Sequence, residues 1–96
     1  MNGKQRAYLR KLANQIDTVF QVGKNGVNAN FIKQVNDYLE AHELIKVKVL
    51  ENSEYTTKEA AEITAAKSDA HVIQVIGTKF VLYREARMIE NRKIMI

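Results

Sequence analysis

The most informative segment of this chain reads Thr18-Val19-Phe20-Gln21-Val22-Gly23-Lys24-Asn25-Gly26. Its first part is rich in β-branched and aromatic residues and stops at a glycine, so it predicts a strand over residues 18–22. Its second part is a short loop with a glycine at each end. Asn28, a good N-cap, then opens a segment to His42 that has the pattern of a helix. The segment therefore predicts a strand, a tight loop and a helix in direct succession.

The loop from Gly23 to Gly26 has the parts of a phosphate-binding loop. Glycine adopts backbone conformations closed to other residues and lets a second backbone approach closely. Free N–H groups at a helix start attract anions, and Lys24 adds a full positive charge. Two glycines at this spacing are also common in plain turns, so the loop alone leaves both interpretations open. In KH domains a GxxG loop joins two helices, whereas a strand precedes it here, which disfavours a standard KH domain.

Two further helices are predicted by hydrophobic spacing and capping. Residues 4–16 carry an apolar stripe with helical period, and the basic residues of this segment lie off the stripe. Thr56 and Glu59 form a capping box that opens an alanine-rich helix over 57–67. With the helix over 28–42, the chain is expected to contain three helices.

Three further strands complete the expected sheet. Residues 44–50 alternate almost perfectly, which places Lys46 and Lys48 on the face opposite the apolar residues. Strands over 72–76 and 80–84 flank a tight turn and predict a hairpin. The order α-β-α-β-α-β-β predicts a single α/β domain over residues 1–84. The last residues, 85–96, hold no persistent period and are expected to form a tail or a weakly docked extension.

Composition limits the class of protein. The chain has 96 residues, of which 46% are apolar, and it carries 15 basic against 11 acidic residues, a net charge of +4. This suits one globular domain and a nucleic-acid partner, although many small basic proteins bind none. The absence of cysteine excludes a disulfide scaffold and thiol catalysis. No segment has the pattern of a signal peptide or a membrane span, so a soluble cytoplasmic protein is expected.

No catalytic or metal-binding constellation is recognisable. The histidines are His42 and His71, each at a predicted element boundary. The acidic side chains are spread along helix faces, as in solvated surfaces, and no ligand cluster is present. We therefore expect no enzyme activity, no cofactor, no metal and no small-molecule substrate.

Basic side chains on several elements form the candidate site. Any one of them alone is ordinary solvated surface, but gathered on one side they would bind phosphates. The predicted site comprises Arg6, Arg10, Lys11, Gly23, Lys24, Asn25, Gly26, Lys46, Lys48 and Arg84. Tyr83, beside Arg84 near a strand end, is a candidate exposed aromatic residue. The other aromatic residues considered are expected to fill the core: Tyr8, Phe20, Phe31, Tyr38 and Phe80.

Four ordered blocks of sequence resemble a known family. They are residues 5–13 (QRAYLRKLA), 21–27 (QVGKNGV), 42–49 (HELIKVKV) and 75–84 (VIGTKFVLYR). These blocks closely resemble the YhbY-like bacterial proteins, the stand-alone form of the CRM domain (chloroplast RNA splicing and ribosome maturation). The resemblance covers residues 4 to about 84. One departure is Ser68-Asp69 at the exit of the third predicted helix, where a glycine is common in the family.

The resemblance implies a fold, a partner and a role. The implied fold is a four-stranded mixed sheet with three helices, similar to the C-terminal domain of translation initiation factor 3. The implied partner is RNA. For bacterial single-domain members, the resemblance further implies that the protein associates with the precursor of the large ribosomal subunit. A protein-interaction module that docks on a ribosomal protein or assembly factor through an open sheet face is the alternative. The oligomeric state is not predicted by the sequence.

Overall fold

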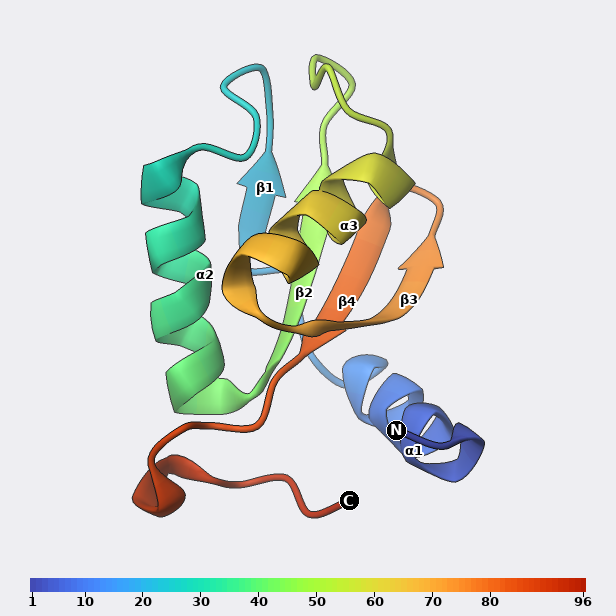
Figure 1. The fold of residues 1–96 in the computed structure, drawn as a ribbon. Helices are drawn as coiled ribbons and strands as arrows, with labels where there is room; N and C mark the ends of the chain where they lie inside the picture. Colours follow the sequence, from blue (N-terminus) through green and yellow to red (C-terminus); the bar gives the residue numbers. More distant parts are fainter.

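The computed structural model describes all 96 residues of the chain. Three helices and four strands follow one another in the expected order (Figure 1). The helices are α1 (Gly3–Ala13), α2 (Ala29–His42) and α3 (Thr57–Ser68), and a short 3-10 helix spans Ile89–Asn91. The strands are β1 (Phe20–Val22), β2 (Leu44–Val49), β3 (His71–Ile76) and β4 (Lys79–Tyr83). None of the helices has both the length and the apolar character needed to cross a membrane.

The four strands form one mixed sheet in the order β1-β2-β4-β3. β1 pairs with β2 in parallel, and the remaining pairs are antiparallel. The last two strands form the expected hairpin, with Gly77 at φ +59° in its turn. The prediction of a single α/β domain with a four-stranded mixed sheet and three helices is therefore confirmed.

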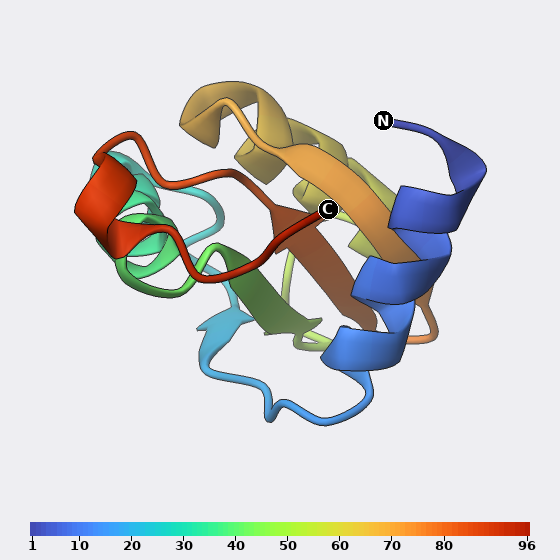
Figure 2. The ribbon, with the colours of Figure 1, turned by 90° about the horizontal axis from the view of Figure 1, so that it is seen from below.

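Both faces of the sheet are covered, but not to the same extent. α2 and α3 pack on one face over a core that includes Val22, Val47 and Phe80. α1 packs on the other face, where Leu9 and Ala13 meet Val81. Seen from below, β3 and β4 lie between α3 and α1 (Figure 2). The expected open face is thus partly closed by α1.

Side-chain caps set the start of each helix. Asn2 and Gln5 form a capping box for α1, and Thr56 and Glu59 form the predicted one for α3. The side chain of Asn28 accepts the N–H of Phe31 at 2.8 Å at the start of α2. The predicted first helix, 4–16, is too long at its C-terminal end, because Asn14 is the C-cap and a turn follows it.

Two helices end at non-glycine residues whose backbone adopts the left-handed conformation. Asp69 ends α3 with φ 54°, and Glu43 ends α2 with φ 67°. The departure noted at Ser68-Asp69 therefore changes the residue type without changing the turn, since aspartate tolerates this conformation better than most side chains. The N–H of Ala70 donates to the carbonyl of Ala65 at 2.9 Å and completes the end of the helix.

The C-terminal segment 85–96 is docked against the end of α2. The carboxylate of Glu40 accepts the N–H groups of Arg87 and Met88 and the side-chain amide of Asn91 at 2.8–3.1 Å. The buried carboxylate of Glu43 accepts three more backbone N–H groups from this segment. The red segment passes below the end of α2 in Figure 1, and in Figure 2, seen from below, it crosses in front of that end before it returns towards the sheet.

Candidate nucleic-acid interface

The GxxG loop is a tight turn whose second glycine is required by the backbone. Gly26 has φ +66°, and its N–H donates to the carbonyl of Gly23 at 3.0 Å. Lys24 and Asn25, between the glycines, are exposed to solvent. A hollow of about 270 Å³ lies beside the loop and the start of α2. The loop therefore presents a cation and an amide at the edge of a polar hollow.

Free backbone donors lie next to this loop. Asn28 caps α2 by accepting the N–H of Phe31, but the N–H groups of Ala29 and Asn30 have no partner within the protein. Such groups carry the partial positive charge of a helix start. The expected anion-attracting helix start is thus present beside Lys24.

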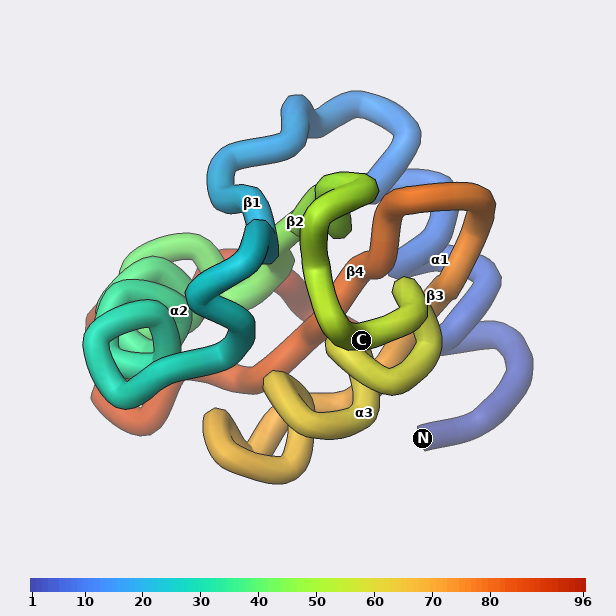
Figure 3. The backbone as a smooth tube through the Cα atoms, turned by 90° about the horizontal axis from the view of Figure 1, so that it is seen from above, coloured from blue at the N-terminus to red at the C-terminus, as the bar shows by residue number.

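The GxxG loop and the loop after β2 lie side by side. β1 and β2 are parallel, so their carboxyl ends meet at the same edge of the sheet, as Figures 1 and 3 show. A β-carbon at Gly23 would lie 3.4 Å from Oδ1 of Asn52, and one at Gly26 would lie 3.1 Å from a ring carbon of Tyr55. The second loop therefore supports the GxxG loop from behind.

Lys46 and Lys48 lie on the α1 side of the sheet, as the alternation of their strand predicts. Both side chains are half-buried, whereas Ile45 and Val47 of the same strand are fully buried on the opposite face. Lys48 is the register partner of Gln21 on β1 and of Lys79 on β4. These three residues therefore form one row across the sheet, just before the GxxG loop.

The three α1 residues of the predicted site divide into two groups. Arg10 and Lys11 are exposed in the last turn of the helix, at the end that leads towards β1. Arg6 is partly buried instead, and its Nη1 donates to the carbonyl of Val72 on β3 at 2.7 Å. Arg6 thus helps to hold α1 on the sheet.

The predicted site residues do not all come together. α1 lies at the opposite end of the molecule from the GxxG loop (Figure 1). Lys46 lies between these ends, because the N–H of Val19, in the segment that joins α1 to β1, donates to its carbonyl at 3.0 Å. The arrangement is therefore an elongated track from α1 over β2 to the loop, not a compact cluster.

Arg84 is not a surface residue, and its prediction as part of the site is wrong. It is 7% exposed, and its Nη1 donates to Asn36 Oδ1 at 2.7 Å and to the carbonyl of Ser68 at 2.8 Å. It thereby ties the end of α3 to α2, and burial lowers the pKa of its guanidinium. Tyr83, the candidate exposed aromatic residue, is also buried. Tyr83 is buried because β4 is a central strand, and Arg84, which follows this strand, is buried by its hydrogen bonds to α2 and α3.

The aromatic residues follow the core prediction only in part. Phe80 is fully buried, and Phe20, Phe31 and Tyr38 are partly buried between β1 and α2. The prediction that Tyr8 fills the core is wrong, because 45% of its surface is exposed on α1. The apolar stripe of α1 is narrower than the spacing suggests, since only one side of this helix faces the sheet.

The ion pairs of the protein lie away from this track. They join Lys33 to Asp37 on α2, Lys58 to Glu62 on α3, and two arginines of the C-terminal segment to acidic residues. The cations of the track form none of these pairs: Arg10, Lys11, Lys24, Lys46, Lys48 and Lys79. α1 contains no acidic residue at all. The cations of the track therefore have no ion-pair partner within the protein.

Lys79 and Gln21 belong to this surface and were missed by the sequence prediction. Each is an ordinary polar residue next to a turn or in an edge strand, with no motif around it. Their significance depends on the strand register, which places both beside Lys48. The turn Gly77-Thr78 before Lys79 was the only available signal.

Basic side chains clustered on one face of a small α/β domain are typical of nucleic-acid-binding modules. The family model of the CRS1/YhbY (CRM) domain matches residues 1–84. The chain belongs to the CRS1/YhbY (CRM) domain family.

Individual relatives agree with this assignment. The chain is 46% identical over 94 residues to the Probable RNA-binding protein YqeI of Bacillus subtilis, covering 98% of this chain and 96% of that protein. It is 31% identical over 96 residues to an RNA-binding protein of Haemophilus influenzae, covering 100% and 94% of the two chains. A solved structure of a hypothetical Staphylococcus aureus protein, described as a candidate RNA-binding protein, superimposes with a TM-score of 0.77 at 45% identity and 99% coverage of both chains.

Proposed function

We propose that this protein binds RNA through phosphate contacts along the track from α1 over β2 to the GxxG loop. The observation that carries the proposal is the separation of charge. The cations of the track have no acidic partner, whereas Lys33 on α2, Lys58 on α3 and two arginines of the C-terminal segment are paired. Unneutralised cations spread over one face suit a polyanion, because each one that meets a phosphate releases a counterion. The names of the relatives in Bacillus subtilis and Haemophilus influenzae support the same partner.

The proposed role is non-catalytic and cytoplasmic, in assembly of the large ribosomal subunit. Its support is the resemblance to bacterial single-domain members, together with an elongated basic surface that can follow a structured RNA. In a cell lysate at low salt, the protein should sediment with large subunits and their precursors. Sedimentation with free protein only, or equally with small subunits, would count against this role.

The alternative of a protein-docking module has weaker support. It requires a large exposed apolar patch near Lys46 and Lys48. Two large apolar side chains exposed by 40% or more lie in this area: Val19, and Ile76, the register partner of Lys79. The others lie at or just before α1, on β3 and in the C-terminal segment. A basic, largely polar surface favours RNA over an apolar protein partner.

A salt titration tests the proposal directly. If four to six phosphates are neutralised, log K should fall against log[salt] with a slope of roughly −3 to −5. A flat dependence would reject phosphate binding by this surface.

A further inference from the structure

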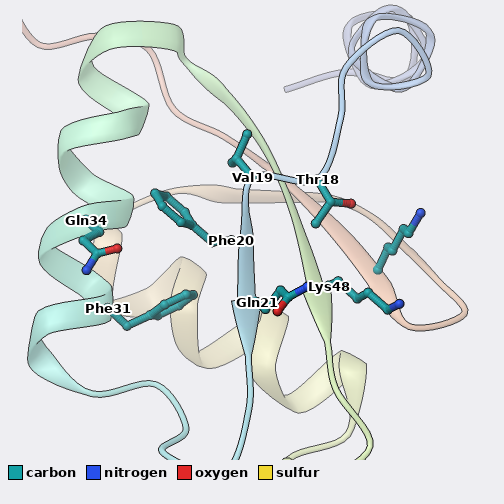
Figure 4. A pocket seen from close by; sticks show the side chains of 8 residues that line it. Thr18, Val19, Phe20, Gln21, Phe31, Gln34 and Lys48 are labelled. Atoms are coloured by element: carbon teal, nitrogen blue, oxygen red, sulfur yellow. The ribbon is translucent and has the colours of Figure 1, made fainter.

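A second hollow lies beside the edge strand β1, next to the GxxG loop. It has a volume of about 510 Å³ and lies between β1, α2 and the row formed by Lys48 and Lys79. Figure 4 shows Phe31 reaching from α2 towards β1, while Gln21 on β1 lies beside Lys48. The hollow is thus bounded by an aromatic ring, amide side chains and two cations.

This hollow continues the one at the loop. Gln21, Phe31 and Gln34 line both of them. The two hollows therefore form one groove along β1, with Lys24 at the loop end and the Lys48–Lys79 row beside Gln21.

The row of lysines is unfavourable unless an anion lies against it. Lys48 and Lys79 are direct register partners on neighbouring antiparallel strands. Like charges in directly opposite positions destabilise a sheet, and neither lysine has an acidic partner. A bound phosphate would remove this repulsion.

The amides and the ring between the cations suit a nucleobase. Gln21 and Gln34 are exposed, and neither side chain forms a hydrogen bond within the protein. Each offers a donor and an acceptor, the combination that base edges require. Phe31 is partly buried and is held edge-to-face by Phe20, with ring centroids 6.3 Å apart, so its orientation is fixed. Aromatic rings held in this way are stacking platforms for bases of single strands.

The geometry points to an unpaired nucleotide, not a base pair, in this groove. The major groove of an RNA duplex is too deep and narrow for side chains to read, whereas single strands can splay their bases into pockets. We propose that a short single-stranded stretch of RNA lies along β1, with one base between Gln21, Phe31 and Gln34. Its phosphates contact Lys24 on one side and Lys48 and Lys79 on the other. This inference rests on the proposed RNA binding and adds recognition of an unpaired base to it.

The test compares two RNAs and three variants of the full chain. One RNA is a blunt hairpin, and the other is the same hairpin with an eight-nucleotide single-stranded overhang. The parent protein should bind the overhang RNA more tightly than the blunt hairpin. Gln21→Ala and Gln34→Ala should each weaken binding of the overhang RNA roughly three- to tenfold, the loss expected for one hydrogen-bonding group, with an unchanged salt slope. Both residues are exposed, so the fold should be retained.

Gln74→Ala is the matched control, because Gln74 lies on β3, the opposite edge of the sheet. It should bind both RNAs as the parent does. A 4-thiouridine in the overhang should crosslink to residues 18–34. Equal affinity of all three variants for the overhang RNA, or crosslinks confined to α1, would overturn the inference while leaving phosphate binding intact. Failure of the parent to bind either RNA would instead reject the proposed function itself.

Discussion

The carboxylate of Glu43 accepts the backbone N–H of Ala86 at 2.7 Å, although 43 residues separate them in the chain. The other carboxylate oxygen accepts the N–H groups of Lys93 and Ile94 at 2.7 and 2.8 Å. Glu43 is fully buried. One side chain at the exit of α2 therefore fixes both ends of the segment 86–94, which makes this segment part of the folded domain.

Glu43→Gln should loosen this segment. Glutamine keeps the shape of the side chain but presents an NH₂ group to at least one of the three N–H donors. We expect a loss of about 1–3 kcal/mol in the free energy of unfolding, and faster amide hydrogen exchange over residues 86–94. Glu90→Gln, an exposed carboxylate on the short 3-10 helix, is the control. Unchanged stability and exchange in Glu43→Gln would contradict the anchoring role.

Acid should release the same segment. Hydrogen bonds from Asn91, Arg87 and Met88 lower the pKa of Glu40 from 4.5 to about 2. Burial raises the pKa of Glu43, but its backbone donors outweigh burial, so the net shift is also downward. Because both pKa values are lower in the folded state, the stabilisation is complete above pH 4.5 and is lost as the pH falls towards 2.

NMR can follow this release through the amide signals of Met88 and Lys93 between pH 6 and pH 2. These signals should move before those of β2. Signals that stay constant down to pH 2, or that change only with global unfolding, would show that the two carboxylates do not control docking.

Arg84→Lys should affect stability and not RNA binding. Lysine keeps the charge but cannot donate to Asn36 and Ser68 at the same time in the planar geometry of the guanidinium. We expect a loss of about 2–3 kcal/mol in the free energy of unfolding, with an unchanged salt slope of RNA binding. Arg87→Lys, in an exposed pair with Asp69, should change stability little. A reduced salt slope for Arg84→Lys would return Arg84 to the RNA-binding surface.

Local patterns were sufficient for the elements and for part of the site. The alternation of residues 44–50 placed Lys46 and Lys48 on the correct face, since the period of a strand fixes the side of each residue. The glycine loop between a strand and a capped helix was also predictable, because cap residues and glycines act within a few positions.

Features that depend on distant partners were not predictable. Arg84 is buried by contacts with residues 48 and 16 positions away, and a basic residue near a strand end gives no local sign of this. Lys79 joins the site only through its register with Lys48. The C-terminal segment is docked through two carboxylates that accept its backbone N–H groups. Such contacts do not require apolar residues at regular spacing, so the sequence of this segment shows no pattern that would predict its docking.

The two glycines of the loop should respond differently to alanine. At Gly26 the positive φ and a ring carbon of Tyr55 only 3.1 Å from the added carbon make alanine strained, so stability should fall by about 1–2 kcal/mol. At Gly23 the nearest atoms would be 3.4 and 3.6 Å away and φ is not positive, so stability should stay close to that of the parent.

Gly23→Ala is therefore the cleaner test of close RNA approach. If RNA backbone passes within contact distance of the loop, this variant should bind RNA more weakly at an unchanged salt slope, because no charge is altered. Thermal unfolding establishes that the variant is folded. Binding equal to that of the parent would make the loop a plain turn and leave RNA binding to the lysines and α1.

Single lysine substitutions separate the track from general positive charge. Lys24→Ala and Lys48→Ala should each lower the affinity for RNA and reduce the magnitude of the salt slope by about one unit, because each removes one phosphate contact. Lys33→Ala removes the same charge from α2, where Lys33 pairs with Asp37 at 3.1 Å and lies outside the track. Lys33→Ala should leave the salt slope unchanged.

The measurement is an RNA titration at several salt concentrations for the parent and the three variants. Equal changes of slope in all three variants would mean that net charge alone attracts RNA. A loss confined to Lys24→Ala and Lys48→Ala would support binding along the track, since these lysines lie on it and Lys33 does not.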